Sequence, residues 1–204
     1  MSNSALRIAR SLTVPGAAPT PDLPPGLLVE LSGDRETARL SAAVSAVRRA
    51  QAQGETVAWI QPESGSLYPP DLAEAGLDLD SLVVVRVPAS FGSVGLSRAT
   101  EILVRSGALG CVVVDARDLR FKLPPAWQGK LLGAVREHGS RILFLTSHST
   151  GSESVGSLVG LRLEPRRVRF APGLFAIEHH VLKNKPGLHF AESLERRRGP
   201  RGIR

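Results

Sequence analysis

Five short apolar segments, separated by stretches of helical periodicity, constrain the fold of this 204-residue chain more than any other feature. They centre near residues 30, 58, 84, 113 and 144, and the spacing of about 26 to 31 residues is that of βαβ units. The segments are apolar almost throughout, without alternation, which indicates parallel strands covered on both faces. We therefore predict an α/β fold with a mostly parallel sheet flanked by helices.

The expected elements follow from the same pattern. Strands are expected at 27–32, 56–60, 82–87, 111–116 and 141–147, helices at 36–53, 94–106 and 126–138, and a helical turn near 71–75. Three further segments, at 156–165, 167–173 and 174–185, predict strands joined by tight turns. We expect these to form an antiparallel extension of the sheet.

The two ends of the chain differ from its centre, so the sequence divides into four parts. Residues 1–12 predict an amphipathic helix, with Ile8 and Leu12 on its apolar face. Residues 13–26 contain five of the fifteen prolines and predict an extended linker. Residues 27–190 form the expected core domain, and residues 191–204, a basic tail with few apolar side chains, are expected to be disordered.

The charge of the chain lies at one end. The net charge is +7, and residues 162–204 carry eleven basic and four acidic residues, so that this segment accounts for all of it. A nucleic acid or an acidic protein partner would explain the asymmetry. A solvated basic tail without a partner explains it equally well, and charge alone leaves both interpretations open.

Several classes of protein are disfavoured by the composition. The single cysteine, Cys111, precludes an intramolecular disulfide and a cysteine-cluster zinc site. His179 and His180 are adjacent on an expected strand and face opposite sides, so no metal site is predicted there. No apolar run approaches the ~18 residues of a membrane span. We expect a cytoplasmic protein with no membrane partner.

The first strand-to-helix turn, residues 32–41, lies where an α/β sheet would carry a phosphate loop. Such a loop follows the pattern G-x-x-x-x-G-K-[ST], whose lysine reaches the phosphates and whose hydroxyl binds Mg²⁺. Gly33 fits the first glycine. Ala38 replaces the second glycine, Arg39 the lysine and Leu40 the hydroxyl residue. The position in the fold therefore fits a phosphate loop, but only the first residue of the pattern is present.

The surrounding sequence resembles the RecA recombinase family over about three quarters of the chain. The segments that carry the resemblance are GLLVELSGDRETARLSAAVSAVRRAQAQGETVAWI (26–60), PPDLAEAGLDLDSLVVV (69–85), ILVRSGALGCVVVDA (102–116), LRLEPRRV (161–168) and VLKNKPGLHF (181–190). The resemblance implies a RecA-like sheet. It also implies that the two DNA-binding loops of the family are absent or shortened, the second to HSTGSESVGS (148–157).

The resemblance assigns roles to single residues. Gly33 and Arg39 stand at phosphate-loop positions and Ser147 replaces a polar sensor glutamine. Glu63 matches the glutamate that orients the attacking water, and Asp115 matches the Walker B aspartate. A solvated loop position for Glu63 and a turn-capping role for Asp115 are the structural alternatives.

Two lysines near the end of the core also have counterparts in the family. Lys183 and Lys185 match the lysines that reach the ATP of the adjacent subunit in a RecA filament. They would mark a retained interface with RecA or, alternatively, protect an exposed edge strand.

A RecA-like chain of this length with such a loop resembles the ImuA family. That resemblance implies a non-catalytic adaptor in DNA-damage-induced (SOS) mutagenesis and translesion synthesis, linking ImuB and RecA to an error-prone replicative-type DNA polymerase at the nucleoid. No cofactor is then expected, the phosphate-loop residues being vestigial. Arg196, Arg197, Arg198 and Arg201 would contact protein or DNA, and the first helix would pack on a partner as the arm of RecA does. Two alternatives stay open, a residual ATP-dependent DNA-binding RecA paralogue and a SulA-type cell-division inhibitor.

Overall fold

A computed structural model describes residues 23–34, 37–65, 67–117, 119, 121–171, 174–188 and 195–198, the last four and residues 169–171 and 174 by their backbone alone. The expected helix over residues 1–12, with Ile8 and Leu12, lies outside the described residues, as does Arg201. Residue 23 falls within the expected linker, yet the Leu23 side chain is buried in the core.

The described elements follow the predicted order. The strands are β1 (Leu27–Leu31), β2 (Val57–Pro62), β3 (Leu82–Val87), β4 (Cys111–Asp115), β5 (Arg141–Leu145), β6 (Leu161–Ala171), β7 (Leu174–Asn184) and β8 (Glu195–Arg198). The helices are α1 (Arg39–Ala52), α2 (Pro69–Glu74), α3 (Gly92–Arg105) and α4 (Pro125–Glu137), with a 3₁₀ turn, η2, at Ala89–Phe91.

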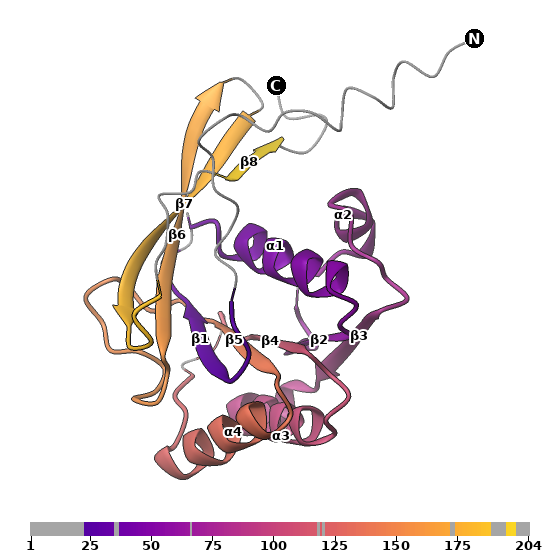
Figure 1. The fold of residues 1–204 in the computed structure, drawn as a ribbon, viewed down its shortest axis with the longest axis vertical. Coiled ribbons are helices and arrows are strands. Elements are labelled where there is room, and N and C mark those ends of the chain that lie inside the picture. The colour runs from indigo at the N-terminus through magenta and orange to yellow at the C-terminus, as the bar shows by residue number, and fades with distance from the viewer. Residues whose placement is uncertain are drawn as a thin grey trace.

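One sheet organises the described residues, with the strand order β3-β2-β4-β5-β1-β6-β7-β8. The strands from β3 to β6 pair in parallel, whereas β7 and β8 pair antiparallel. Helices α1 and α2 lie on one face of the sheet and α3 and α4 on the other (Figure 1). This arrangement confirms the predicted RecA-like fold class.

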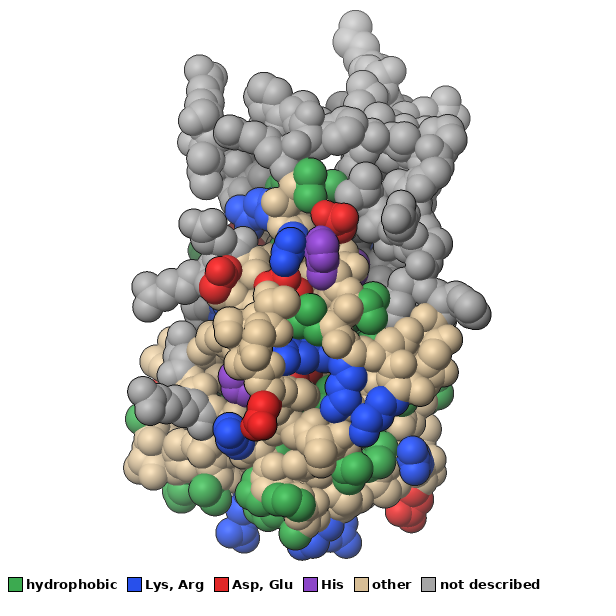
Figure 2. Space-filling model, turned by 90° about the vertical axis from the view of Figure 1, so that its left-hand side faces the viewer, with side chains coloured by type: hydrophobic (Ala, Val, Ile, Leu, Met, Phe, Trp, Pro, Cys, Tyr) green, Lys and Arg blue, Asp and Glu red, His purple; other side chains and the backbone are tan. Residues whose placement is uncertain are grey.

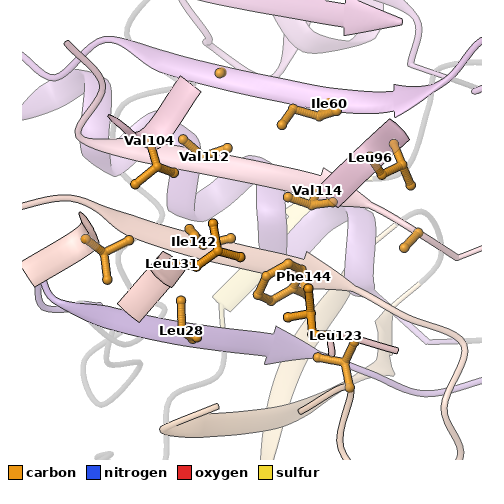
Figure 3. Packing of buried hydrophobic residues seen from close by; sticks show 14 of the residues in the cluster. Leu28, Ile60, Leu96, Val104, Val112, Val114, Leu123, Leu131, Ile142 and Phe144 are labelled. Carbon is orange, nitrogen blue, oxygen red and sulfur yellow. The ribbon is translucent and has the colours of Figure 1, made fainter. Parts of the chain in front are cut away.

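The central strands are apolar because both of their faces are buried, as predicted. Side chains of alternate residues point to opposite faces, so that Ile142 and Phe144 pack toward α4 while Leu143 and Leu145 pack toward α1. Figure 3 shows the first of these clusters, in which Phe144 and Ile142 meet Leu28, Val114 and side chains from the helices. The Phe144 ring centroid lies 5.9 Å from that of Phe121.

The structure departs from the predictions at both edges of the sheet. Strand β3 is covered incompletely, because Val83 and Val84 point to opposite faces and both are exposed. At the other edge, the segments expected as two strands around Pro165 form the single strand β6. A proline removes one backbone donor only, and the carbonyl of Pro165 accepts a hydrogen bond from the Ala38 backbone N–H at 2.8 Å.

The C-terminal tail also differs from the prediction. Residues 191–204 were expected to lack structure, but Glu195–Arg198 form β8, which pairs with Leu174–Ile177 of β7. Hydrogen bonding to an existing strand supplies the stability that the segment lacks on its own. Among the described residues, no helix has the length and apolar character that crossing a membrane would need.

The Phe144 side chain offers a test of the described core. Truncation of fully buried Phe144 to alanine should lower the free energy of unfolding by about 3 to 5 kcal/mol, because it removes a large apolar group and leaves a cavity. The matched control is Phe91→Ala, at a side chain that is 62% exposed, which should change stability by less than about 0.5 kcal/mol. Urea unfolding followed by circular dichroism measures both, and equal losses would contradict the packing described.

Candidate functional site

Four residues with predicted roles lie at one edge of the sheet. Gly33 follows β1, Glu63 follows β2, Asp115 ends β4 and Ser147 follows β5. Strands β1, β5, β4 and β2 are consecutive neighbours and parallel, so their carboxyl ends meet at the same edge. The edge is where an α/β sheet binds its ligands.

Gly33 is required by the turn itself. Its φ of +139° is a backbone conformation that other residues rarely adopt. A Cβ built at this position would stand 2.3 Å from the Thr37 Cγ2 atom, a distance that real side chains do not reach. The geometry of the loop by itself therefore accounts for a glycine at position 33.

The side chain of Arg39 closes the loop after β1. Arg39 is the first residue of α1, and it is only 5% exposed. Its guanidinium donates to the Asp34 carbonyl at 2.6 Å, to the Thr146 carbonyl, and to the Ser147 hydroxyl at 3.2 Å. The group at the lysine position thus ties the phosphate-loop segment to the end of β5.

Asp115 is held in a side-chain pair. Both of its oxygens accept from the Arg117 guanidinium, at 2.8 Å from Nε and 2.7 Å from Nη2, and the Arg117 backbone N–H donates at 3.3 Å. This is the turn-capping role that the residue type suggested, reinforced by an ion pair. A bidentate arginine satisfies the carboxylate that, in a Walker B position, would serve a metal ion.

A hydroxyl joins these two groups. Ser147 accepts from Arg39 and donates to the Arg117 carbonyl, so the ends of β1, β4 and β5 form one hydrogen-bonded chain. The contacts described do not bring Glu63 into this chain: its side chain is exposed, and its backbone N–H donates to the Val87 carbonyl. In the described part of the chain, no group of three or more His, Cys, Asp or Glu side chains could hold a metal ion.

A second polar cluster lies beneath the loop that follows β5. Glu30 in β1 is fully buried, and the ion pair that it forms with Arg162 of β6 has an N–O distance of 3.6 Å. The Glu30 carboxylate also accepts from Thr146 Oγ1 at 2.7 Å, from Ser154 Oγ at 2.6 Å and from the Val155 backbone N–H at 3.0 Å. Nδ1 of His148 lies 2.9 Å from the same carboxylate.

Arg162 donates hydrogen bonds to the backbone of this loop. Its guanidinium donates to the Ser152 carbonyl at 2.5 Å, to the Ser149 carbonyl at 2.8 Å and to the Ser32 hydroxyl at 2.9 Å. The Thr150 hydroxyl donates to Glu164 at 2.8 Å. Residues 148–157, which the resemblance identified as a shortened DNA-binding loop, are thus held against the sheet along their length.

Lys183 of β7 and Lys185, one residue beyond the end of β7, converge on one acceptor. The ammonium groups of Lys183 and Lys185 donate to the Ser157 carbonyl at 3.2 Å and 2.8 Å. Their ammonium groups therefore lie on the same side of the chain, as their spacing predicted. Burial, together with the neighbouring Lys185 charge, holds the pKa of Lys183 below its usual value. Two positive charges near a single neutral acceptor leave this site with an excess of positive charge.

Sequence reasoning pointed to residues of this edge but not to the charged groups that hold the edge and the loop of residues 148–157. Glu30, Arg162 and Arg117 were not singled out, although two of them carried a readable signal. A glutamate in LLVELS and an arginine in GLRLEP each interrupt an apolar strand, and opposite charges in two buried strands favour pairing. Arg117, two residues beyond Asp115, carried no comparable signal.

Comparison with known proteins identifies relatives among the RecA proteins. The profile of the RecA N-terminal domain family matches residues 4–120, more than half of the chain. The chain is 29% identical over 181 residues to Protein RecA of Mycobacterium leprae, covering 80% of this chain and 24% of that protein. It is 27% identical over 207 residues to Protein RecA of Mycolicibacterium smegmatis, covering 84% of this chain and 58% of that protein. The chain therefore spans less than two thirds of the length of these relatives.

The ion pair of Glu30 and Arg162 yields a testable expectation. Glu30→Gln should lower the free energy of unfolding by about 3 to 5 kcal/mol, because it leaves the buried Arg162 charge uncompensated. Arg162→Gln should do the same, and the double variant should lose less than the sum of the two, by at least ~1 kcal/mol. Glu164→Gln serves as the control, because its partner Arg166 is half exposed and the loss should stay within ~1 kcal/mol. Strict additivity in urea unfolding would contradict the pairing.

Proposed function

The chain belongs to the RecA N-terminal domain family, and on that basis we propose that it is a non-catalytic adaptor in DNA-damage-induced mutagenesis. In this role it links ImuB and RecA to the error-prone polymerase of translesion synthesis, in the cytoplasm at the nucleoid. The resemblance to the ImuA family suggests these partners. The scaffold would then provide surfaces for proteins, with no nucleotide cycle of its own.

The observation that supports the proposal is that the side chains at two nucleotide-binding positions of this edge are already bonded to other groups of the protein. The position of the phosphate-binding lysine holds Arg39, whose guanidinium is buried and bonded to the Asp34 and Thr146 carbonyls. The position of the Walker B aspartate holds Asp115, with both oxygens bonded to Arg117. A nucleotide and its metal ion would have to displace these bonds. The loop lacks the metal-binding hydroxyl and the second glycine, whose contacts with the ligand would compensate for the lost bonds.

Two regions of the chain supply partner contacts in this proposal. The lysine pair Lys183 and Lys185 carries an excess of positive charge, and each ammonium has more donors than the Ser157 carbonyl can use. We assign this pair to acidic side chains of RecA. The family profile begins at residue 4, so its match includes the segment with Ile8 and Leu12, which we assign to a second partner contact.

The lysine pair gives the sharpest test of the adaptor. With immobilised RecA from the same organism, the double variant Lys183→Ala/Lys185→Ala should bind about tenfold more weakly than the unmodified chain, because it loses charge-assisted hydrogen bonds worth about 1.4 kcal/mol in total. The other two lysines, Lys122 and Lys130, are exposed elsewhere on the surface and provide a control with the same loss of charge.

Nucleotide dependence separates the adaptor from an ATP-driven paralogue. Affinities for ImuB and for RecA should be the same with and without ATP and Mg²⁺. If both lysine variants bind as the unmodified chain does, the assignment of the RecA surface is wrong. If neither ImuB nor RecA is bound by the full chain under any condition, the adaptor function itself is wrong.

A further inference from the structure

Helix α4, which is described throughout, buries a single polar side chain, that of Gln128. The other side chains that this helix buries are those of Leu131, Ala134 and Val135. Gln128 lies on the same face and is only 3% exposed. Burial of an amide is costly unless its donors and its acceptor are bonded. The partners of the Gln128 amide therefore indicate what this residue does.

The amide of Gln128 is bonded at both of its ends. Its Nε2 atom donates to the Leu123 carbonyl, just before the helix, at 2.6 Å. Its Oε1 atom accepts from the Ser157 hydroxyl at 3.2 Å and from the Leu158 backbone N–H at 2.8 Å. A Cβ built at Gly156 would stand 2.6 Å from the Gln128 Cδ atom, so the chain passes directly over the amide. Residues 156–158 are therefore shaped around one side chain of α4.

The bond from Leu158 sets the direction of a peptide unit. A trans peptide points its N–H and its C=O in opposite directions. The N–H of Leu158 is bonded to the buried Gln128 amide, so the Ser157 carbonyl of the same peptide points away from α4. That carbonyl is the acceptor shared by Lys183 and Lys185, at 3.2 Å and 2.8 Å. Through this one peptide, Gln128 sets the place where the two ammonium groups meet.

The two ammonium groups need such a common acceptor to stay together. Like charges repel, and a lysine side chain loses much rotamer freedom when it is held in one conformation. The Ser157 carbonyl offsets both costs, because it accepts a hydrogen bond from each lysine. An acidic side chain of a partner then meets two charges that are already ordered, which lowers the entropic cost of binding. Figure 2 shows Lys and Arg side chains gathered on the face of the molecule that carries β6 and β7, the strand to which Lys183 belongs.

We infer that Gln128 is the positioning residue of the lysine pair: it orients the Ser157 carbonyl, and this carbonyl holds the two ammonium groups together at the partner surface. Because Gln128 is buried, it acts through the peptide and not by contact with a partner. The inference rests on the proposed function for the identity of the partner, but the geometry of the pair is independent of it.

The geometry is tested on the full chain alone, with its lysines labelled with ¹³C and ¹⁵N. The chain has four lysines, so NMR can follow each ammonium group during a pH titration. Burial and the neighbouring Lys185 charge hold the pKa of Lys183 below its usual value. In Gln128→Met, which keeps a similar volume but loses the hydrogen bonds, the pair should separate and the pKa of Lys183 should rise toward that value. The signals of Lys122 and Lys130 should not change.

The matched control is Leu131→Met, which places the same new side chain on the same buried face of α4 and should leave the lysine signals as they are. Circular dichroism shows whether each variant folds. If Gln128→Met does not fold, Gln128→Asn replaces it, because a side chain one methylene shorter withdraws the amide from the loop and should give the same rise. An unchanged pKa of Lys183 in the folded Gln128 variant, or an equal rise in Leu131→Met, would overturn the inference.

Binding to immobilised RecA connects this geometry with the adaptor. Gln128→Met should weaken binding about fivefold, roughly 1 kcal/mol, and should have no further effect in the Lys183→Ala/Lys185→Ala background. An equal loss in both backgrounds would show that Gln128 does not act through the lysines and would overturn the inference. If no variant binds RecA while the pKa of Lys183 still rises in Gln128→Met, the adaptor proposal fails and the positioning role stands.

Discussion

The buried guanidinium of Arg39 is the constraint on which the edge of this sheet depends. An arginine at the first residue of α1 reaches the carbonyls of two separate segments and draws them together. A lysine has a compact ammonium and could not span the same acceptors with a rigid fork of donors. With Arg39 at this position, the loop after β1 is bonded to the end of β5 of the same chain.

Other groups around this edge are likewise bonded to neighbouring groups of the protein. Asp115 is paired with Arg117, and hydrogen bonds to Glu30 and Arg162 hold the loop of residues 148–157 against the sheet. In each case a position to which the RecA resemblance assigns a ligand contact has an internal partner. The charges that we assign to a partner are those of Lys183 and Lys185, whose ammonium groups donate to the Ser157 carbonyl.

Sequence reasoning recovered the parallel core because its strands are short apolar runs at regular spacing, and burial of both strand faces determines such elements. It failed where the structure of a segment depends on pairing with a distant part of the chain. Glu195–Arg198 has no strand-forming pattern and becomes β8 through its hydrogen bonds to β7. Val83 and Val84 look like core residues, yet β3 is an edge strand. The site followed the same rule. Gly33, Arg39 and Asp115 were identified from their positions in the sequence, whereas the groups bonded to Arg39 and Asp115 were not. Thr146, an acceptor for Arg39, lies 107 residues away, and Arg117, the partner of Asp115, lies in a turn without a recognisable pattern.

Direct titration of ATP into the full chain tests the central claim, that this edge does not serve a nucleotide. Isothermal titration calorimetry with ATP and Mg²⁺ should show no binding tighter than about 1 mM, a binding free energy near −4 kcal/mol. Stoichiometric binding tighter than about 100 μM, roughly −5.5 kcal/mol, and abolished in Asp115→Asn would contradict the account. In that case Arg39 and Arg117 would have to release their bonds to a phosphate and a metal ion, and the chain would be a nucleotide-dependent protein.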